Sequence, residues 1–115
     1  MHTISAKDYE LLGFFEVEPE LFEEDVPWID NDSVYKVNRG DVDLSFAIQP
    51  NERDVRIIMS QNGKILYELN TTGVKDVKVL NEKKFELLEI KINEEQSIIL
   101  SVKPEISIKE TIRQS

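Results

Sequence analysis

The stretch DVRIIMSQNGKILYEL, residues 54–69, carries the strongest local structural signal in the chain. Two apolar-rich runs flank the dipeptide Asn62-Gly63. Asparagine and glycine are favoured in tight turns because both tolerate a positive φ angle. The pattern therefore predicts a β-hairpin that turns at this dipeptide.

The register of this hairpin follows from which side chains must share a face. A two-residue loop would place Ile57 opposite Glu68. A three-residue loop ending at Gly63 instead brings apolar residues together: Met59 with Ile65, Ile57 with Tyr67 and Val55 with Leu69. Because a slip of one residue moves every side chain to the other face, we predict the three-residue loop. Ile58 and Leu66 then lie on the outer face, where we expect the N-terminal segment to cover them.

The same alternation continues on both sides of the hairpin. In VDLSFAI, residues 42–48, apolar side chains alternate with mostly polar ones, which is typical of a strand with one buried face. Further runs of this kind are SVYKV (33–37), VKDVKVL (74–80), KKFELLEIKI (83–92), QSIILSV (96–102) and EISIKETI (105–112). About seven or eight short strands with brief connections predict a mainly β fold, an antiparallel meander that closes as a sandwich or a small barrel.

Two details of the C-terminal strands can also be predicted. The apolar phase slips by one residue at Leu87-Leu88, which indicates a β-bulge. A turn at residues 93–95 would then place Ile90 opposite Ile98.

The N-terminal segment has a helical pattern instead. Residues 5–13, SAKDYELLG, predict a short α-helix with Ser5 as its N-cap, Asp8 completing a capping box and Gly13 following its last turn. Pro19 is expected to open a second helical turn.

We expect a single domain spanning residues 1–115, because the chain is short. Acidic tails that stay disordered are poor in aromatic residues, whereas this segment contains Phe15 and Trp28. Residues 1–32 are therefore expected to form an acidic helical and irregular segment packed on an antiparallel β domain of residues 33–115.

The net charge of −9 is concentrated in the first third of the chain. Residues 1–35 contain ten acidic residues and one lysine, whereas residues 36–115 contain thirteen acidic and thirteen basic residues. The stretch FEVEPELFEEDVPWIDND, residues 15–32, holds eight carboxylates and no lysine or arginine. Such a surface repels phosphates and anionic lipids, so we expect neither nucleic acid nor membrane as a partner, but a basic protein surface.

The composition leaves little for catalysis. There is no cysteine, and the single histidine, His2, lies at the chain terminus, which disfavours catalytic triads and zinc sites. We therefore predict no enzymatic activity and no cofactor. The N-terminus lacks an apolar signal region, and no apolar run approaches the ~20 residues of a membrane span, so a cytoplasmic protein is expected.

The acidic stretch is the candidate functional site. The residues expected to bind a partner are carboxylates and aromatic side chains within it: Glu20, Phe22, Glu23, Glu24, Asp25, Trp28, Asp30 and Asp32. Aromatic anchors usually supply the affinity of an interface, while surrounding charges set association rate and specificity. Two plainer interpretations stay open: the charges only solubilise the protein, and Trp28 only covers one end of the sheet.

The leading hypothesis for function is an acidic protein-binding module, such as an inhibitor or an immunity-type factor that occupies a basic site on another protein. One alternative is a small-ligand carrier whose cavity would be lined by four residues of the β region: Phe46, Met59, Tyr67 and Phe85.

A second alternative is a calcium-binding β domain that uses residues 30–32. The EF-hand pattern fails, because Tyr35 stands where that loop requires glycine, but looser calcium loops stay open. The oligomeric state is open as well, and apolar residues on the outer face, Ile58 and Leu66, are compatible with a dimer.

Overall fold

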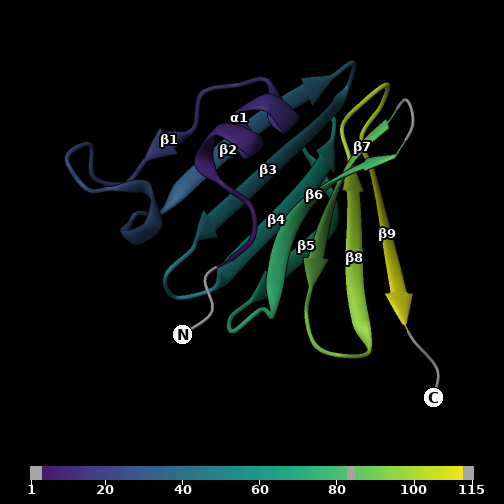
Figure 1. Ribbon diagram of the computed structural model, residues 1–115. Helices are drawn as coiled ribbons and strands as arrows, with labels where there is room; N and C mark the ends of the chain where they lie inside the picture. Colours follow the sequence, from purple (N-terminus) through teal and green to yellow (C-terminus); the bar gives the residue numbers. More distant parts are fainter. Residues whose placement is uncertain (1–3, 83–84, 113–115) are drawn as a thin grey trace.

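The computed structural model describes residues 4–82 and 85–112, which form two antiparallel sheets and one short α-helix (Figure 1). The five-stranded sheet contains β1 (Glu20–Leu21), β2 (Ser33–Arg39), β3 (Val42–Gln49), β4 (Asp54–Gln61) and β5 (Lys64–Thr71). The four-stranded sheet contains β6 (Asp76–Glu82), β7 (Phe85–Lys91), β8 (Gln96–Ser101) and β9 (Ser107–Ile112). Each strand within a sheet pairs with the next along the chain, which confirms the predicted mainly β antiparallel fold. Of the two predicted closures, the division into two sheets corresponds to a sandwich.

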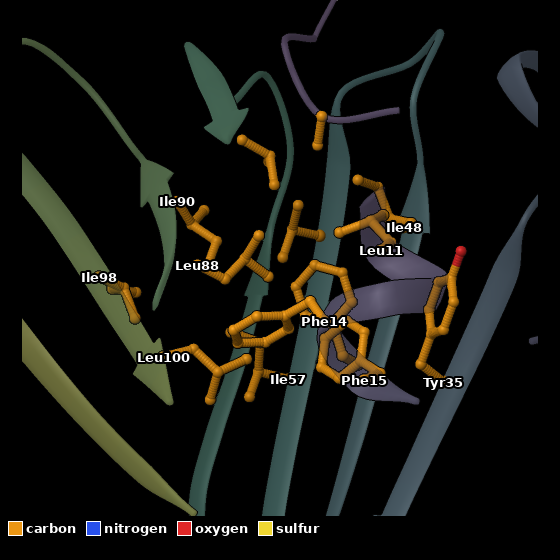
Figure 2. Close-up of a cluster of buried hydrophobic side chains, with 14 of the residues drawn as sticks. Leu11, Phe14, Phe15, Tyr35, Ile48, Ile57, Leu88, Ile90, Ile98 and Leu100 are labelled. Atoms are coloured by element: carbon orange, nitrogen blue, oxygen red, sulfur yellow. The ribbon is translucent and has the colours of Figure 1, made fainter. Parts of the chain in front are cut away.

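Helix α1 (Asp8–Phe15) packs against the inner face of the sandwich (Figure 1). Its residues Phe14 and Phe15 are almost completely buried. The ring of Phe15 stacks on Tyr35 of β2, with 5.0 Å between centroids, and lies 5.1 Å from Phe46 of β3. Figure 2 shows Phe14 and Phe15 in one cluster with Leu100 of β8, so α1 helps to close the core between the two sheets.

This position of α1 contradicts the prediction that the N-terminal segment covers the outer face of the hairpin. Ile58 is 36% exposed and Leu66 is 51% exposed. The inner position is favourable because both Phe14 and Phe15 are enclosed there, which removes two large apolar rings from water.

The helix begins later than predicted. Its first residue is Asp8, and the preceding Lys7 donates its backbone N–H to the Glu10 carboxylate at 2.9 Å. Ser5 is not the N-cap, since its hydroxyl donates to the Asp76 carboxylate of β6 at 2.6 Å. The chain before the helix is thus fastened to the edge of the four-stranded sheet.

The helix also ends later than predicted. Gly13 lies inside it, and the left-handed residue at its end is Glu16, with φ at 60° and an N–H that donates to Leu12 O at 2.8 Å. The extra residues are those that fill the core. The helical turn predicted at Pro19 is wrong as well, because the next two residues form β1 and pair with β2.

The β4–β5 hairpin forms where predicted, but in a different register. Asn62 and Gly63 both have positive φ, at 51° and 81°, in a two-residue loop. The ladder then shifts by one residue, so that Met59 lies opposite Tyr67 and not opposite Ile65. The predicted pairing is therefore wrong. The predicted inner face is right, because the bulge restores the phase of the alternation.

The bulge predicted at Leu87-Leu88 is also wrong. The register between β6 and β7 runs without a shift along the whole length of the two strands. Leu88 and Ile90 point into the core, while Leu87 is half-buried on the opposite face. The predicted pairing of Ile90 with Ile98 is confirmed.

Candidate functional site

The acidic loop, residues 22–32, connects β1 to β2 and projects from the edge of the five-stranded sheet (Figure 1). It is ordered by its own backbone: Phe22 N–H donates to Asp32 O at 2.9 Å, and Val26 N–H donates to Glu23 O at 3.2 Å. A 3₁₀ turn, η1 (Trp28–Asp30), lies near its end. These bonds give the loop a defined backbone conformation.

A buried asparagine holds the loop together. Asn31 is 2% exposed. Its amide nitrogen donates to the carbonyl oxygens of Glu23 and Val26 at 2.6 and 3.0 Å, and its amide oxygen accepts from Glu23 N–H at 3.2 Å. One side chain therefore fixes both arms of the loop. This role cannot be predicted from the sequence, because it depends on which backbone groups the folded loop brings to Asn31.

Two further hydrogen bonds dock the loop onto the connection between β3 and β4. Gln49 donates its side-chain N–H to Asp30 O at 3.0 Å, and Asn51 donates its backbone N–H to Ile29 O at 2.9 Å. These bonds hold the backbone of the acidic loop in one position relative to the five-stranded sheet.

The structure separates the predicted partner-binding carboxylates into two groups. Glu20 pairs with Lys36, at 3.2 Å between Oε2 and Nζ, and Asp32 pairs with Arg56. The other group is exposed and has no ion-pair partner within residues 4–82 and 85–112: Glu23, Glu24, Asp25 and Asp30. These four leave the negative charge of the loop uncompensated.

The two predicted aromatic residues lie in different environments. Phe22 is 78% exposed and, with Glu23, Asp30 and Asp32, lines a shallow hollow of about 260 Å³. Trp28 is half-buried and packs against the core, as the covering interpretation predicts. It also lines a second hollow beside α1, so it contributes to both the core and the surface.

The structure argues against the ligand-carrier alternative, because three of the four residues expected to line a cavity pack in or against the core. Phe46 is fully buried and in ring contact with Phe15, and Met59 and Tyr67 pack against the same core. The side chain of Phe85 lies outside the described part of the structure.

The calcium alternative finds no arranged ligands in the described residues, which contain no group of three or more His, Cys, Asp or Glu side chains placed to hold a metal ion. The amide of Asn31, at the centre of the proposed calcium loop, binds backbone groups instead. In the same part of the chain, no helix is long and apolar enough to span a membrane.

Comparison with known proteins places the fold. No protein-family model and no curated protein sequence matches the chain. Among solved structures, it is similar to a chain of a contact-dependent growth inhibition toxin–immunity protein complex from Klebsiella pneumoniae 342. The TM-score is 0.77 and the sequence identity is 22%, and the match covers 92% of this chain and 93% of that chain. At this identity, what the two chains share is the fold.

Proposed function

We propose that this chain is a non-enzymatic, immunity-type protein that binds a basic surface of a growth-inhibition toxin and neutralises it in the cytoplasm. The observation that carries the proposal is the acidic loop, which combines exposed, uncompensated carboxylates with the exposed ring of Phe22 on an ordered backbone. The likeness in fold to a chain of a toxin–immunity complex supports a role in protein binding.

The rigidity of the loop favours binding over mere solubilisation. Ordering a residue costs roughly 1–2 kcal/mol of backbone entropy, and a loop that serves only solubility needs no such order. Because Asn31 fixes both arms of the loop before any partner arrives, less of this cost remains at the moment of association. The carboxylates would then steer the encounter, and Phe22 would anchor the complex.

A growth assay tests the function. Bacteria that express the toxin of the Klebsiella complex, or a toxin encoded beside this chain, are expected to resume growth when this chain is co-expressed. Growth arrest caused by this chain alone would assign it to the toxin side of such complexes and overturn the proposal.

Association kinetics test the mechanism with two variants of equal charge. One carries Glu23→Gln, Glu24→Gln, Asp25→Asn and Asp30→Asn. The control neutralises four exposed glutamates elsewhere: Glu52, Glu68, Glu86 and Glu105. At low salt the loop variant should associate with the toxin about tenfold more slowly than the control, and the difference should vanish in high salt. Equal rates for both variants would show that only the net charge matters.

A further inference from the structure

The second hollow, which we name the helix groove, lies between α1 and the chain that follows it, residues 18–28, and has a volume of about 250 Å³. Tyr9 and Leu12 of α1 and Leu21 of β1 line it, and these apolar side chains are 70%, 39% and 40% exposed. Trp28 and the fully buried Tyr35 also line it. The groove is thus an apolar and aromatic surface that opens to solvent.

Two buried polar atoms beside the groove are incompletely hydrogen-bonded. The Tyr35 hydroxyl and the Trp28 indole nitrogen Nε1 have no hydrogen bond of good geometry within the described chain. Figure 2 shows the hydroxyl directed away from Phe14 and Phe15 of the core. Burial raises the pKa of Tyr35, and the side chain of Trp28, which acts on the hydroxyl as a hydrogen-bond donor of poor geometry, partly opposes that rise. A buried hydroxyl without a well-aligned hydrogen bond is costly, so N–H donors brought to its free lone pairs would stabilise this end of the groove. The Trp28 N–H is itself a donor and gains nothing from such a ligand.

The charge of the groove limits what that ligand is. Asp8 and Glu18 are exposed lining residues, and among the described residues no lysine or arginine lines the groove. Neither carboxylate has an ion-pair partner in the described part of the chain; Asp8 accepts a hydrogen bond from Tyr9 N–H at 2.8 Å. Both carboxylates contribute to the raised pKa of Tyr35, so their charge acts on its hydroxyl. An anionic ligand would be repelled, and a cation would be attracted.

We propose that the helix groove binds an arginine side chain presented by the partner protein. This inference rests on the proposed function and adds a second contact to the acidic loop. A guanidinium group has five N–H donors in a planar fork, enough for Asp8, Glu18 and the acceptor lone pairs of the Tyr35 hydroxyl. Its flat face stacks on an aromatic ring such as Trp28 or Tyr9. A lysine ammonium is compact and strongly hydrated, so it stacks less favourably than a guanidinium on the aromatic side chains of the groove.

The single tryptophan of the chain makes a direct test available, because its indole N–H gives one NMR resonance. The full chain is titrated with the blocked tripeptide Ac-Ala-Arg-Ala-NH₂ and with the same peptide carrying citrulline, which keeps the shape of arginine without its charge. The arginine peptide should shift the Trp28 resonance saturably at millimolar concentration, and the citrulline peptide should not. Equal shifts with both peptides, or no shift with either, would overturn the proposal.

Variants locate the binding site. The pair Asp8→Asn and Glu18→Gln, at two exposed positions, should abolish the shift without unfolding the protein. Tyr35→Phe should weaken the affinity for the arginine peptide about tenfold, because a hydrogen bond to a charged group is lost. Tyr67→Phe, which removes another tyrosine hydroxyl away from the groove, should leave the affinity unchanged. Full affinity in the Asp8/Glu18 variant would contradict the proposal even if Tyr35→Phe proved unstable.

The peptide titration needs no toxin, so the two proposals can fail separately. If growth rescue succeeds while the arginine peptide does not bind, the groove is excluded and the acidic loop remains as the binding surface. If the peptide binds but the chain rescues no toxin-expressing cell, the groove exists but the immunity function is wrong.

Discussion

The acidic loop and the outer face of the four-stranded sheet carry charge in opposite ways. The sheet face has a hollow of about 780 Å³ lined by both signs of charge, with Lys78 lying 3.8 Å from Glu89 and Lys91 lying 3.6 Å from Glu94. The electric fields of two opposite charges this close together largely cancel at longer range. Salt screens the remainder beyond a Debye length of about 8 Å at physiological ionic strength. The loop has several carboxylates without this compensation in the described chain. What distinguishes the candidate site is therefore missing compensation on an ordered backbone, and not charge density alone.

The largest expected effect is on stability, and it distinguishes a core phenylalanine from a surface phenylalanine of the same N-terminal segment. Phe15→Ala should destabilise the protein by about 3–5 kcal/mol, because a fully buried ring between the sheets is lost. Phe22→Ala should change stability by less than about 0.5 kcal/mol, since that ring is 78% exposed. Urea denaturation measures both values. A large loss of stability for Phe22→Ala would mean that the acidic loop is part of the core, and the distinction between loop and core would be wrong.

A smaller effect is expected at the residue that orders the loop. Asn31→Ala removes three part-buried hydrogen bonds and leaves the backbone groups of Glu23 and Val26 without these partners, at a cost of about 1–3 kcal/mol. Hydrogen exchange should show lost protection at Glu23 N–H, with the sheets unaffected. The control is Asn38→Ala, which also removes three hydrogen bonds, but at an exposed position where water replaces them. Equal losses for the two variants would contradict a specific role for Asn31.

The sequence predicts the β region well because burial on one side dictates a period of two. It fails on the hairpin register for a physical reason: one extra residue in a bulge leaves both apolar faces unchanged while moving Met59 from Ile65 to Tyr67. The pattern of apolar residues cannot distinguish these two pairings.

The N-terminal segment is predicted less well because tertiary contacts override its local signals. The glycine signal at Gly13 is outweighed by the burial of Phe14 and Phe15, and β1 forms because the edge of β2 offers backbone partners. Asn31 and Tyr35 could not have been identified as parts of a site. The relevant property of each residue is the hydrogen bonding of its polar group, and this depends on which groups the folded chain brings near it.

The smallest expected effect concerns a carboxylate of the four-stranded sheet that is bound by a tyrosine hydroxyl and not by a lysine or arginine. Tyr67 of β5 donates its hydroxyl to Glu110 of β9 at 3.1 Å and so joins the two sheets. Burial, this hydrogen bond and the charge of Glu110 raise the pKa of Tyr67 from 10.0 to about 12. Because the raised pKa belongs to the folded state, the protonated hydroxyl stabilises the fold below pH 10, and this contribution is lost as the pH rises from 10 to 12.

Tyr67→Phe should therefore lower stability by less than about 1 kcal/mol at neutral pH, since the hydrogen bond is exposed to solvent. Between pH 10 and 12 its melting temperature should fall less steeply than that of the unmodified chain. Circular dichroism melts across this range measure the difference, and Glu110→Gln, which keeps an acceptor but removes the charge, should give an intermediate slope. Identical slopes in all three proteins would show that the contact between β5 and β9 contributes nothing to the pH dependence. Glu110 would then be an uncompensated carboxylate of the four-stranded sheet, and the contrast with the acidic loop would be weaker than the ion pairs indicate.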